Sequence, residues 1–544
     1  MDRVGVIARR MPRVREVPRA LRVALAVGSG LACAAAFPPW DLGPAAFLGL
    51  VPLFLALEGC APRQAARLGY VAGLSFYLAT IWWVIITMTT YGRMPLALSL
   101  VALLLLCGIL AGYTAAFAWL LAAGRQRLRL AWGILPLVAA ALWTALEFVR
   151  TYLFSGFPWA LLGSSQYRQP TIRLLASAVG VYGISALLVL VNGALASLLT
   201  WRLQPRSEGE RWRKGLLPIG LAAVAVLAAV GYAQLLWRDP TGGGPIRVGL
   251  LQGNIDQSLK WDRTYQTATL AIYERLSRQV ATERPALIVW PETAVPFFLR
   301  RDVELSARVH RLATETGIPL LTGSPDLGGD RLLYNAAFLL GGDGRIRGGY
   351  AKRHLVPFGE YVPLKTIFFF LDKLVVGIGD FGRGRDATVF SLDGTRFSVM
   401  ICYEVIFPGE VRDFVRGGAQ FLVNITNDAW FGRSGAPSQH LAMAAMRAVE
   451  NGTYLVRAAN TGVTAVIGPT GEILTATDLF TEAAVLGTIR PRQGETPYTR
   501  YGDVLAWIAM AFLGAYVLAL LHARWTGRVR QSLTSHWFHG RRWK

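Results

Sequence analysis

Three side chains that could support nucleophilic catalysis each follow a short apolar run that is typical of a β-strand. Glu292 ends LIVWPE, Lys352 lies in YAKRHLVPFGEYVP, and Cys402 ends FSVMIC. A thiol is a weak nucleophile until it loses its proton, so it needs a nearby base or cation. Glu292 could accept that proton, and Lys352 could stabilise the thiolate and then an oxyanion. We therefore predict one catalytic site where these strands end.

The composition indicates a membrane protein. The chain has 544 residues, of which 53% are hydrophobic and only 17% are charged, whereas soluble domains carry about 25% charged residues. Apolar runs near the length of about 20 residues that crosses a hydrocarbon core recur along the chain. We expect eight spans, near 21–37, 45–59, 68–90, 95–123, 131–154, 172–200, 215–236 and 503–522. The first two of these runs are short for full spans.

The formal net charge of +22 follows the order of these spans. Basic residues concentrate in alternate connections and in the tail, namely 3–19, 63–67, 125–129, 202–214 and 524–544. The other short connections carry few basic residues besides Arg93 and Arg168. This positive-inside pattern predicts that both termini are cytoplasmic and that residues 238–502 lie outside, in the periplasm of a bacterium with two membranes. The charge is therefore explained by topology, and we expect no nucleic-acid partner.

Cys402 could be a packed thiol, half of a disulfide or a nucleophile. The other cysteines, Cys33, Cys60 and Cys107, all lie in or beside predicted spans. The exported segment thus offers Cys402 no disulfide partner, although thiols outside the cytosol are commonly oxidised in pairs. The lack of a disulfide partner favours a reactive thiol. The positions of the cysteines alone also leave an inert packed thiol as the alternative.

The exported segment has the pattern of an α/β domain. Short β-rich runs occur at 246–254, 286–292, 319–324, 333–341, 396–404, 421–428, 453–460, 464–469 and 483–489, and helical patterns at 262–282, 302–316 and 437–451. Nearly continuous apolar strands that alternate with helices predict sheets covered by helices. We divide the chain into a membrane domain (1–237, about seven helices), a catalytic domain (238–500), a closing span (501–523) and a basic cytoplasmic tail (524–544).

Three motifs occur in an order that is typical of one enzyme superfamily. WPETAVP, KRHLVPFGEYVP and ICYEVIFP resemble the glutamate, lysine and cysteine motifs of the carbon–nitrogen hydrolase (nitrilase) superfamily. Together with the amino-terminal bundle and the closing span, they resemble the apolipoprotein N-acyltransferase family of the bacterial inner (cytoplasmic) membrane. This resemblance covers nearly the whole chain. It implies an αββα sandwich domain that faces the periplasm, with Glu292, Lys352 and Cys402 as its catalytic triad.

The resemblance also implies a reaction and its partners. Cys402 would take an acyl group from a phospholipid as a thioester, and the α-amine of a diacylglyceryl-cysteine at the amino terminus of an apolipoprotein would then accept it. We expect membrane lipids as surroundings, no cofactor and a monomer. One alternative is a membrane-tethered amidase or nitrilase that acts on a small amide. Another is a transporter or polytopic scaffold with an inert exported domain.

Two further positions match family residues beside the triad. Glu360 in FGEYVP matches a second glutamate that supports the lysine and positions the acceptor, and its alternative role is a loop salt bridge. Trp261 in NIDQSLKWD matches a tryptophan implicated in lipid-substrate handling, with core packing as the alternative. Asn335 in LYNAA, together with Asn427 and Asp428, is expected to order the site or the surrounding structure.

Tyr403 and Glu404 directly follow the candidate nucleophile and match family residues that are needed for function. Neighbouring side chains on a strand point to opposite faces, so Tyr403 would point away from a Cys402 that faces the site. A turn at this position is therefore required if both side chains contribute. The sequence leaves open whether Tyr403 and Glu404 contact substrate or hold the end of the strand.

Several other stretches lead to more general expectations. His310, His354 and His440 are too scattered for a metal cluster, so we predict no metal site. Residues 365–384 are unusually apolar for a loop, and we expect an interfacial arm that admits acyl chains, with a core helix as the alternative. Trp430 and Phe431 could extend that lipid-facing surface. Glu147 and Arg150 lie one turn apart in an apolar span and are expected to pair.

Overall fold

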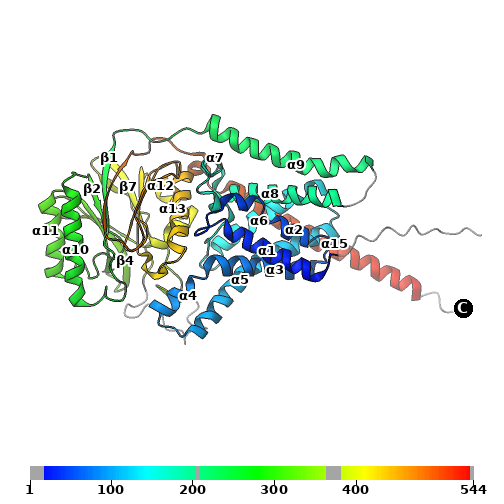
Figure 1. Cartoon of the computed structure of the whole chain (residues 1–544), viewed down its shortest axis with the longest axis horizontal. Coiled ribbons are helices and arrows are strands. Elements are labelled where there is room, and N and C mark those ends of the chain that lie inside the picture. The colour runs from blue at the N-terminus through cyan, green and yellow to red at the C-terminus, as the bar shows by residue number, and fades with distance from the viewer. Residues whose placement is uncertain (1–16, 131, 204–207, 363–380, 540–544) are drawn as a thin grey trace, which may run out of the picture.

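The computed structural model describes residues 17–130, 132–203, 208–362 and 381–539 (Figure 1). A bundle of helices forms one end of the molecule, and two β-sheets with their own helices form the other end. Most of the predicted apolar arm lies outside the described residues, since they omit 363–380.

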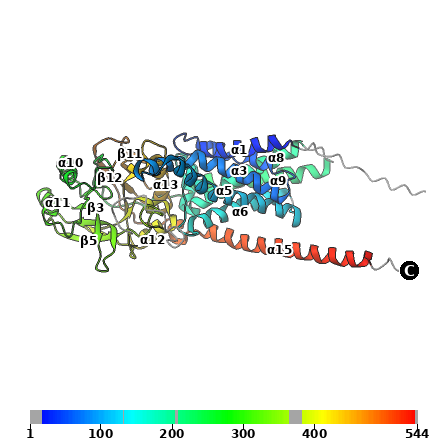
Figure 2. The same cartoon turned by 90° about the horizontal axis from the view of Figure 1, so that it is seen from below.

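The bundle is built mainly from the amino-terminal half of the chain. Its helices are α1 (Arg19–Ala35), α2 (Val51–Ala56), α3 (Pro62–Ile81), α4 (Val84–Ile86), α5 (Leu96–Arg127), α6 (Leu135–Tyr152), α7 (Pro170–Leu174), α8 (Ala176–Leu203) and α9 (Glu208–Gly231). Short helical turns connect them, namely η1 (Gly43–Phe47), η2 (Thr87–Tyr91), η3 (Trp132–Ile134), η4 (Leu162–Gln166) and η5 (Tyr232–Leu236). The short α14 (Pro497–Tyr501) precedes α15 (Val504–His539), which runs along the bundle (Figure 2).

Four helices in the described part of the chain are long and apolar enough to cross a membrane. They are Leu96–Arg127, Ala176–Arg202, Leu216–Leu236 and Val504–Thr526. A fifth span results if Pro62–Ile81 and Val84–Tyr91, which meet at 58°, form one broken helix. These helices support membrane character. The predicted count of eight is not reached, because α1 has only 17 residues, the apolar stretch Gly43–Ala56 is short, and α6 contains Glu147 and Arg150.

The other end of the molecule contains two six-stranded sheets. The first has the order β12-β1-β2-β3-β4-β5 and the second the order β11-β10-β9-β8-β7-β6. The strands of the first sheet are β1 (Ile246–Gln252), β2 (Leu287–Val289), β3 (Leu320–Leu327), β4 (Leu333–Leu340), β5 (Ile346–Ala351) and β12 (Ala483–Ile489). Those of the second are β6 (Phe390–Leu392), β7 (Thr395–Ile401), β8 (Phe421–Thr426), β9 (Leu455–Ala459), β10 (Ala465–Ile467) and β11 (Ile473–Ala476).

Helices cover the outer face of each sheet. α10 (Arg263–Ala281) and α11 (Val303–Thr316) lie on the first sheet, while α12 (Pro408–Arg416) and α13 (Ala436–Asn451) lie between the second sheet and the bundle (Figure 1). This is the predicted αββα arrangement. It forms because β7, β8 and β9 are buried along almost their whole length, so both of their faces must be covered.

The strand prediction was incomplete at the sheet edges. The edge strands β5, β6 and β11 were not predicted, and neither was the helix α12. Edge strands are short or glycine-rich and carry little hydrophobic pattern. The hairpin turn between β6 and β7 has φ angles of 45° at Asp393 and 84° at Gly394, and positive φ at both central residues is characteristic of a type I′ turn.

Gln439 of α13 connects the two parts of the molecule. Its Oε1 accepts hydrogen bonds from the indole N–H groups of Trp83 (3.2 Å) and Trp159 (2.7 Å). Its Nε2 donates to the carbonyl oxygens of Pro38 (2.8 Å) and Thr80 (3.0 Å). All of these partners belong to the bundle or its connections, so one buried amide ties three bundle segments to the sheet-covering helix.

The predicted pair of Glu147 and Arg150 is present, with 4.0 Å between Oε1 and Nη2. Arg150 also donates from Nη1 to the carbonyl oxygens of Phe157 (3.2 Å) and Trp159 (2.8 Å). The guanidinium therefore holds the connection after α6, which lies directly against the second sheet's helical layer. The charge has a structural role here, because it satisfies backbone carbonyls that the apolar surroundings leave without water.

Candidate active site

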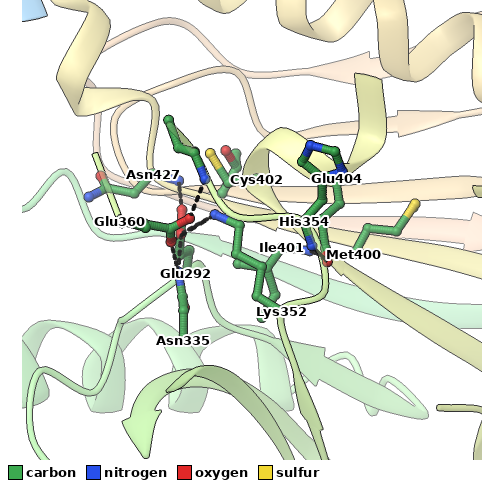
Figure 3. Close-up of polar contacts among 12 residues, drawn as sticks. Glu292, Asn335, Lys352, His354, Glu360, Met400, Ile401, Cys402, Glu404 and Asn427 are labelled. Carbon is green, nitrogen blue, oxygen red and sulfur yellow. Dashed lines mark hydrogen bonds and ion pairs between the residues drawn. The ribbon is translucent and has the colours of Figure 1, made fainter. Parts of the chain in front are cut away.

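The three candidate catalytic residues come from both sheets. Glu292 is the third residue after β2, and Lys352 directly follows β5 in the same sheet. Cys402 directly follows β7 of the other sheet. Figure 3 shows Cys402 beside the cluster formed by Glu292, Lys352 and Glu360. The candidate site therefore lies between the ends of the two sheets.

Both carboxylate oxygens of Glu292 have hydrogen-bond partners in the structure. Oε1 accepts from Asn335 Nδ2 at 2.8 Å and lies 3.7 Å from Lys352 Nζ. Oε2 accepts from the backbone N–H of Asn427 at 2.8 Å. The carboxylate is nearly buried, and these contacts from both sheets fix its orientation.

Lys352 is held by a second carboxylate. Its Nζ donates to Glu360 Oε1 at 2.9 Å, and the same oxygen accepts from Asn335 Nδ2 at 2.8 Å. Glu360 Oε2 accepts from the N–H of Val356 at 2.8 Å, which shapes the loop after β5. Burial alone would lower the pKa of Lys352, but Glu360 and then Glu292 outweigh it and raise this pKa above its ordinary value. The side chain is therefore a permanent cation at neutral pH.

Cys402 occupies a strained turn at the end of β7. Its φ is 52°, and β7 changes there into the helical turn η6 (Cys402–Ile406). A non-glycine residue in the left-handed region costs about 1–2 kcal/mol and persists only when its surroundings enforce it. This is the turn that the sequence required at this position. It interrupts the alternation of the strand directly after the nucleophile candidate.

The Cys402 thiol is protonated at rest. Burial raises its pKa most, the charge of Glu292 raises it further, and the charge of Lys352 lowers it. A protonated thiol is a poor nucleophile, so reaction requires a base that removes the proton as the sulfur attacks. Glu292 is the carboxylate that acts most strongly on this thiol.

Comparisons with known proteins cover both parts of the chain. Residues 29–194 match the model of the apolipoprotein N-acyltransferase N-terminal domain, and residues 247–498 match that of the carbon-nitrogen hydrolase family. An apolipoprotein N-acyltransferase of Geobacter metallireducens is 43% identical and aligns over 95% of this chain and 98% of its own. The corresponding enzyme of Nitrosomonas europaea is 37% identical over 93% and 98% of the two chains. The chain belongs to the apolipoprotein N-acyltransferase family.

Among solved structures, an amidase from Nesterenkonia sp. resembles one part of this family member. It covers 49% of this chain and 96% of its own chain, with 21% identity and a TM-score of 0.36. This weak similarity adds nothing to the family assignment.

In this apolipoprotein N-acyltransferase family member, Glu404 connects the lysine loop to the cysteine turn. Oε1 accepts from Tyr350 Oη (2.6 Å) and from the N–H groups of Arg353 (2.6 Å) and His354 (3.1 Å). Oε2 accepts from the N–H of Ile401 at 2.7 Å. Burial raises the pKa of Glu404 to about 7 against the effect of these donors. The side chain thus bonds the backbone on either side, next to Lys352 and next to Cys402.

Tyr403 contacts the bundle. Its hydroxyl donates to the carbonyl oxygen of Gly156 at 3.3 Å, and its ring packs against those of His354 and Phe407. His354 Nε2 in turn lies 2.9 Å from the carbonyl oxygen of Ser155. The sequence left the role of Tyr403 open. Its contacts now assign it to the boundary between the catalytic layer and the bundle.

A buried polar trio supports the carbonyl group of Cys402. His440 Nε2 lies 3.2 Å from that oxygen, and His440 Nδ1 lies 3.0 Å from both Asp428 Oδ1 and Arg457 Nη2. Burial, followed by the charge of Arg457, lowers the pKa of His440. The lowered pKa favours the neutral imidazole, and the carbonyl partner requires Nε2–H as the donor, so Nδ1 accepts from Arg457 Nη2 and forms no hydrogen bond with Asp428. Sequence reasoning placed Asp428 near the site but considered His440 only as a metal ligand.

Sequence reasoning missed Lys260 as well as Arg457. Lys260 Nζ donates to the backbone carbonyl of Glu292 at 3.1 Å, and the side chain is 2% exposed. A lysine in a polar turn is ordinarily solvated, so the sequence held no signal of this burial. Its neighbour Trp261 is half-buried, and no hydrogen bond or ring contact joins it to the triad among the described residues.

Trp430 and Phe431 line the boundary with the bundle. Phe431 packs against Trp83 and Trp159, with ring centroids 4.8 Å and 5.8 Å away, and Trp430 packs against Tyr91 at 5.5 Å. Both side chains remain partly exposed beside these bundle aromatics, so their contribution to a lipid-facing surface stays a prediction. No cluster of three or more metal-ligating side chains occurs in the described ranges.

Proposed function

We propose that this protein transfers an acyl group from a phospholipid to the α-amine of an amino-terminal diacylglyceryl-cysteine of apolipoproteins, the final step of lipoprotein maturation. The relatives that align over almost the whole chain bear the name apolipoprotein N-acyltransferase. The observation that carries the proposal is the strained, buried Cys402 beside a carboxylate and a permanent ammonium.

The first half-reaction forms a thioester. The Cys402 sulfur attacks the carbonyl carbon of the sn-1 ester while Glu292 takes the thiol proton. Lys352 stabilises the oxyanion of the tetrahedral intermediate. Collapse of this intermediate breaks the ester C–O bond, and Glu292 returns the proton to the departing oxygen. Lysophospholipid leaves, and the acyl group remains on sulfur.

The second half-reaction forms an amide. The free α-amine of the acceptor attacks the thioester carbonyl, Glu292 accepts a proton from the nitrogen, and Lys352 again stabilises the oxyanion. The C–S bond then breaks, and the thiolate recovers its proton. Glu360 and Asn335 support this cycle indirectly, since they hold Lys352 and Glu292 at 2.8–2.9 Å. We also propose that Trp261 takes part in handling the lipid substrate.

The arrangement of the chain in the membrane is part of the same proposal. Residues 1–237 form a membrane domain, 238–500 the periplasmic catalytic domain, 501–523 a closing span and 524–544 a cytoplasmic tail. Eight spans with both termini in the cytoplasm of a bacterial inner membrane agree with the distribution of basic residues. We propose a monomer that works without metal or cofactor.

Intact-mass measurement tests the proposal directly. The purified full-length protein is incubated with a phospholipid of defined acyl chains, without acceptor. We expect one added acyl mass on Cys402 and release of lysophospholipid. Cys402→Ala should lose the added mass, whereas Cys107→Ala, which removes a buried thiol of the bundle, should keep it. Ammonia release from small amides without lipid turnover would instead support the amidase alternative.

A further inference from the structure

The candidate site contains a second buried ammonium whose charge is not matched by a direct partner. Lys260 lies between β1 and α10, and its side chain is 2% exposed. Among the described residues its one hydrogen bond is to the backbone carbonyl of Glu292, at 3.1 Å. An ammonium has three donors, and taking one into the interior is costly without an opposite charge nearby. Its burial at this location therefore needs an explanation.

The charges of the neighbouring side chains explain why Lys260 is buried here. Glu292 and Glu360 share a single ammonium, Lys352, at 3.7 Å and 2.9 Å, so these three groups together have a net charge of −1. A net negative cluster opposes formation of a thiolate. Lys260 brings the total to zero. The total then stays at zero when the Cys402 proton moves to Glu292, because this transfer only moves the negative charge from oxygen to sulfur.

The hydrogen bond of Lys260 also has a positional effect. The carbonyl that it binds belongs to the peptide between Glu292 and Thr293, and Thr293 has a φ of 47°. A β-branched residue in the left-handed region is strained and needs its neighbours to hold it. The lysine therefore fixes the backbone from which the Glu292 side chain projects.

We propose that Lys260 is a positioning residue of this active site, which orients Glu292 and supplies the second positive charge that the Cys402 thiolate needs. This inference rests on the proposed role of Cys402 as the nucleophile. It does not depend on the identity of the acyl donor or acceptor.

The protonation of Lys260 gives the inference a pH signature. Burial lowers the pKa of Lys260 to about 8, while Glu292 and Cys402, the two charged or titratable groups that act on it, raise it. Behind them, Lys352 and Asp428 act on Cys402. Lys260 is therefore charged at neutral pH and loses its charge as the pH rises through about 8. Above that pH, the thiolate has one cation fewer.

Three substitutions separate the two contributions of Lys260. Lys260→Arg keeps a charge that does not titrate, Lys260→Gln keeps a donor without charge, and Lys260→Met removes both. The readout is the rate at which iodoacetamide alkylates Cys402 in the full-length protein, mapped by peptide mass at several pH values. Arg263→Gln is the matched control, because it removes an exposed charge three residues away.

We expect Lys260→Gln and Lys260→Met to lower the alkylation rate at pH 7 about tenfold or more, which corresponds to a rise of one unit or more in the thiol pKa. Lys260→Arg should stay within about threefold of wild type. The ratio of the wild-type rate to the Lys260→Arg rate should fall as the pH rises past 8. Arg263→Gln should follow the wild-type profile.

Two results would overturn the inference. One is that Lys260→Gln and Lys260→Met match wild type in rate and pH profile. The other is that Lys260→Arg is as slow as Lys260→Met, which would mean that charge is irrelevant and the side chain only packs. Failure of the proposed function is distinct. In that case the Lys260 variants behave as expected, but phospholipid leaves no acyl mass on Cys402.

Discussion

The hydroxyl of Tyr403 donates a hydrogen bond to the carbonyl oxygen of Gly156, with 3.3 Å between the two oxygens. The residue directly after the candidate nucleophile is thus tied to the connection that follows α6 of the bundle. The strained turn at Cys402 makes this possible, since it redirects the chain between the two side chains. The position of the Cys402 thiol is therefore coupled to the contact between the second sheet and the helical bundle.

Tyr403→Phe should have a small effect, because it removes only this one long hydrogen bond. We expect a loss of less than about 1 kcal/mol in stability and near-normal thioester formation. Tyr403→Ala should cost about 3–5 kcal/mol, since it leaves a cavity beside Phe407. Thermal unfolding in detergent and intact-mass kinetics measure both effects. A severe kinetic defect in Tyr403→Phe with unchanged stability would instead mean that the hydroxyl acts on substrate.

Asn335→Asp should be more harmful than Asn335→Ala. Asn335 Nδ2 donates to one oxygen each of Glu292 and Glu360, at 2.8 Å. An aspartate would remove the donor and add a third carboxylate to the cluster, whereas alanine removes only the donor. Hydrogen bonds to charged groups contribute about 1.5–3 kcal/mol, so we expect thioester formation to fall roughly 10- to 100-fold in the alanine variant. Equal rates for the two variants would contradict this electrostatic interpretation.

Glu404→Gln should destabilise the protein and change the pH dependence of its stability. The folded-state pKa of about 7 lies above the ordinary glutamate pKa of 4.5. The protonated carboxyl therefore favours folding, and this contribution is lost as the pH rises from about 4.5 through 7. Over that window the stability advantage of wild type over the variant should shrink by up to about 3 kcal/mol. Thermal midpoints measured across the window check this, and a constant difference would disprove it.

His440→Phe should slow the reaction of Cys402 without removing the thiol. The substitution deletes the donor to the Cys402 carbonyl, and the left-handed turn then loses a contact that enforces it. We expect alkylation of Cys402 to slow several-fold, with a similar loss in thioester formation. His310→Phe, which changes a histidine on α11, is the control and should react like wild type. Normal Cys402 reactivity in His440→Phe would remove His440 from the positioning of the nucleophile.

Gln439→Ala should weaken the connection between α13 and the bundle. The substitution leaves two indole N–H groups and two backbone carbonyls without their partner. Each buried group left unsatisfied costs about 1–3 kcal/mol. We expect a clear drop in the midpoint of thermal unfolding, measured against Ser438→Ala on the same helix. An unchanged midpoint would show that water replaces the amide at this boundary.

Much of this protein is readable in its sequence because membrane spans, buried strands and reactive residues have strong local signatures. Long apolar runs with basic flanks indicate a polytopic membrane protein. Near-continuous apolar strands alternating with helices predict sheets covered by helices, and the family resemblance implies their αββα order. The short edge strands β6 and β11 carry too little pattern to be found. The motifs around Glu292, Lys352 and Cys402 identify candidate catalytic residues because a thiol that reacts needs a base and a cation.

Other features depend on contacts between residues far apart in the chain. The sequence cannot show that Lys260 is buried beneath Glu292, that Glu404 bonds backbone on both sides of the site, or that Tyr403 reaches the bundle. In each case the role depends on which backbone groups the two sheets and the bundle bring within hydrogen-bond distance of the side chain. Residue type and spacing thus determine what chemistry is possible, and only tertiary packing decides which polar groups lose water and must pair with one another.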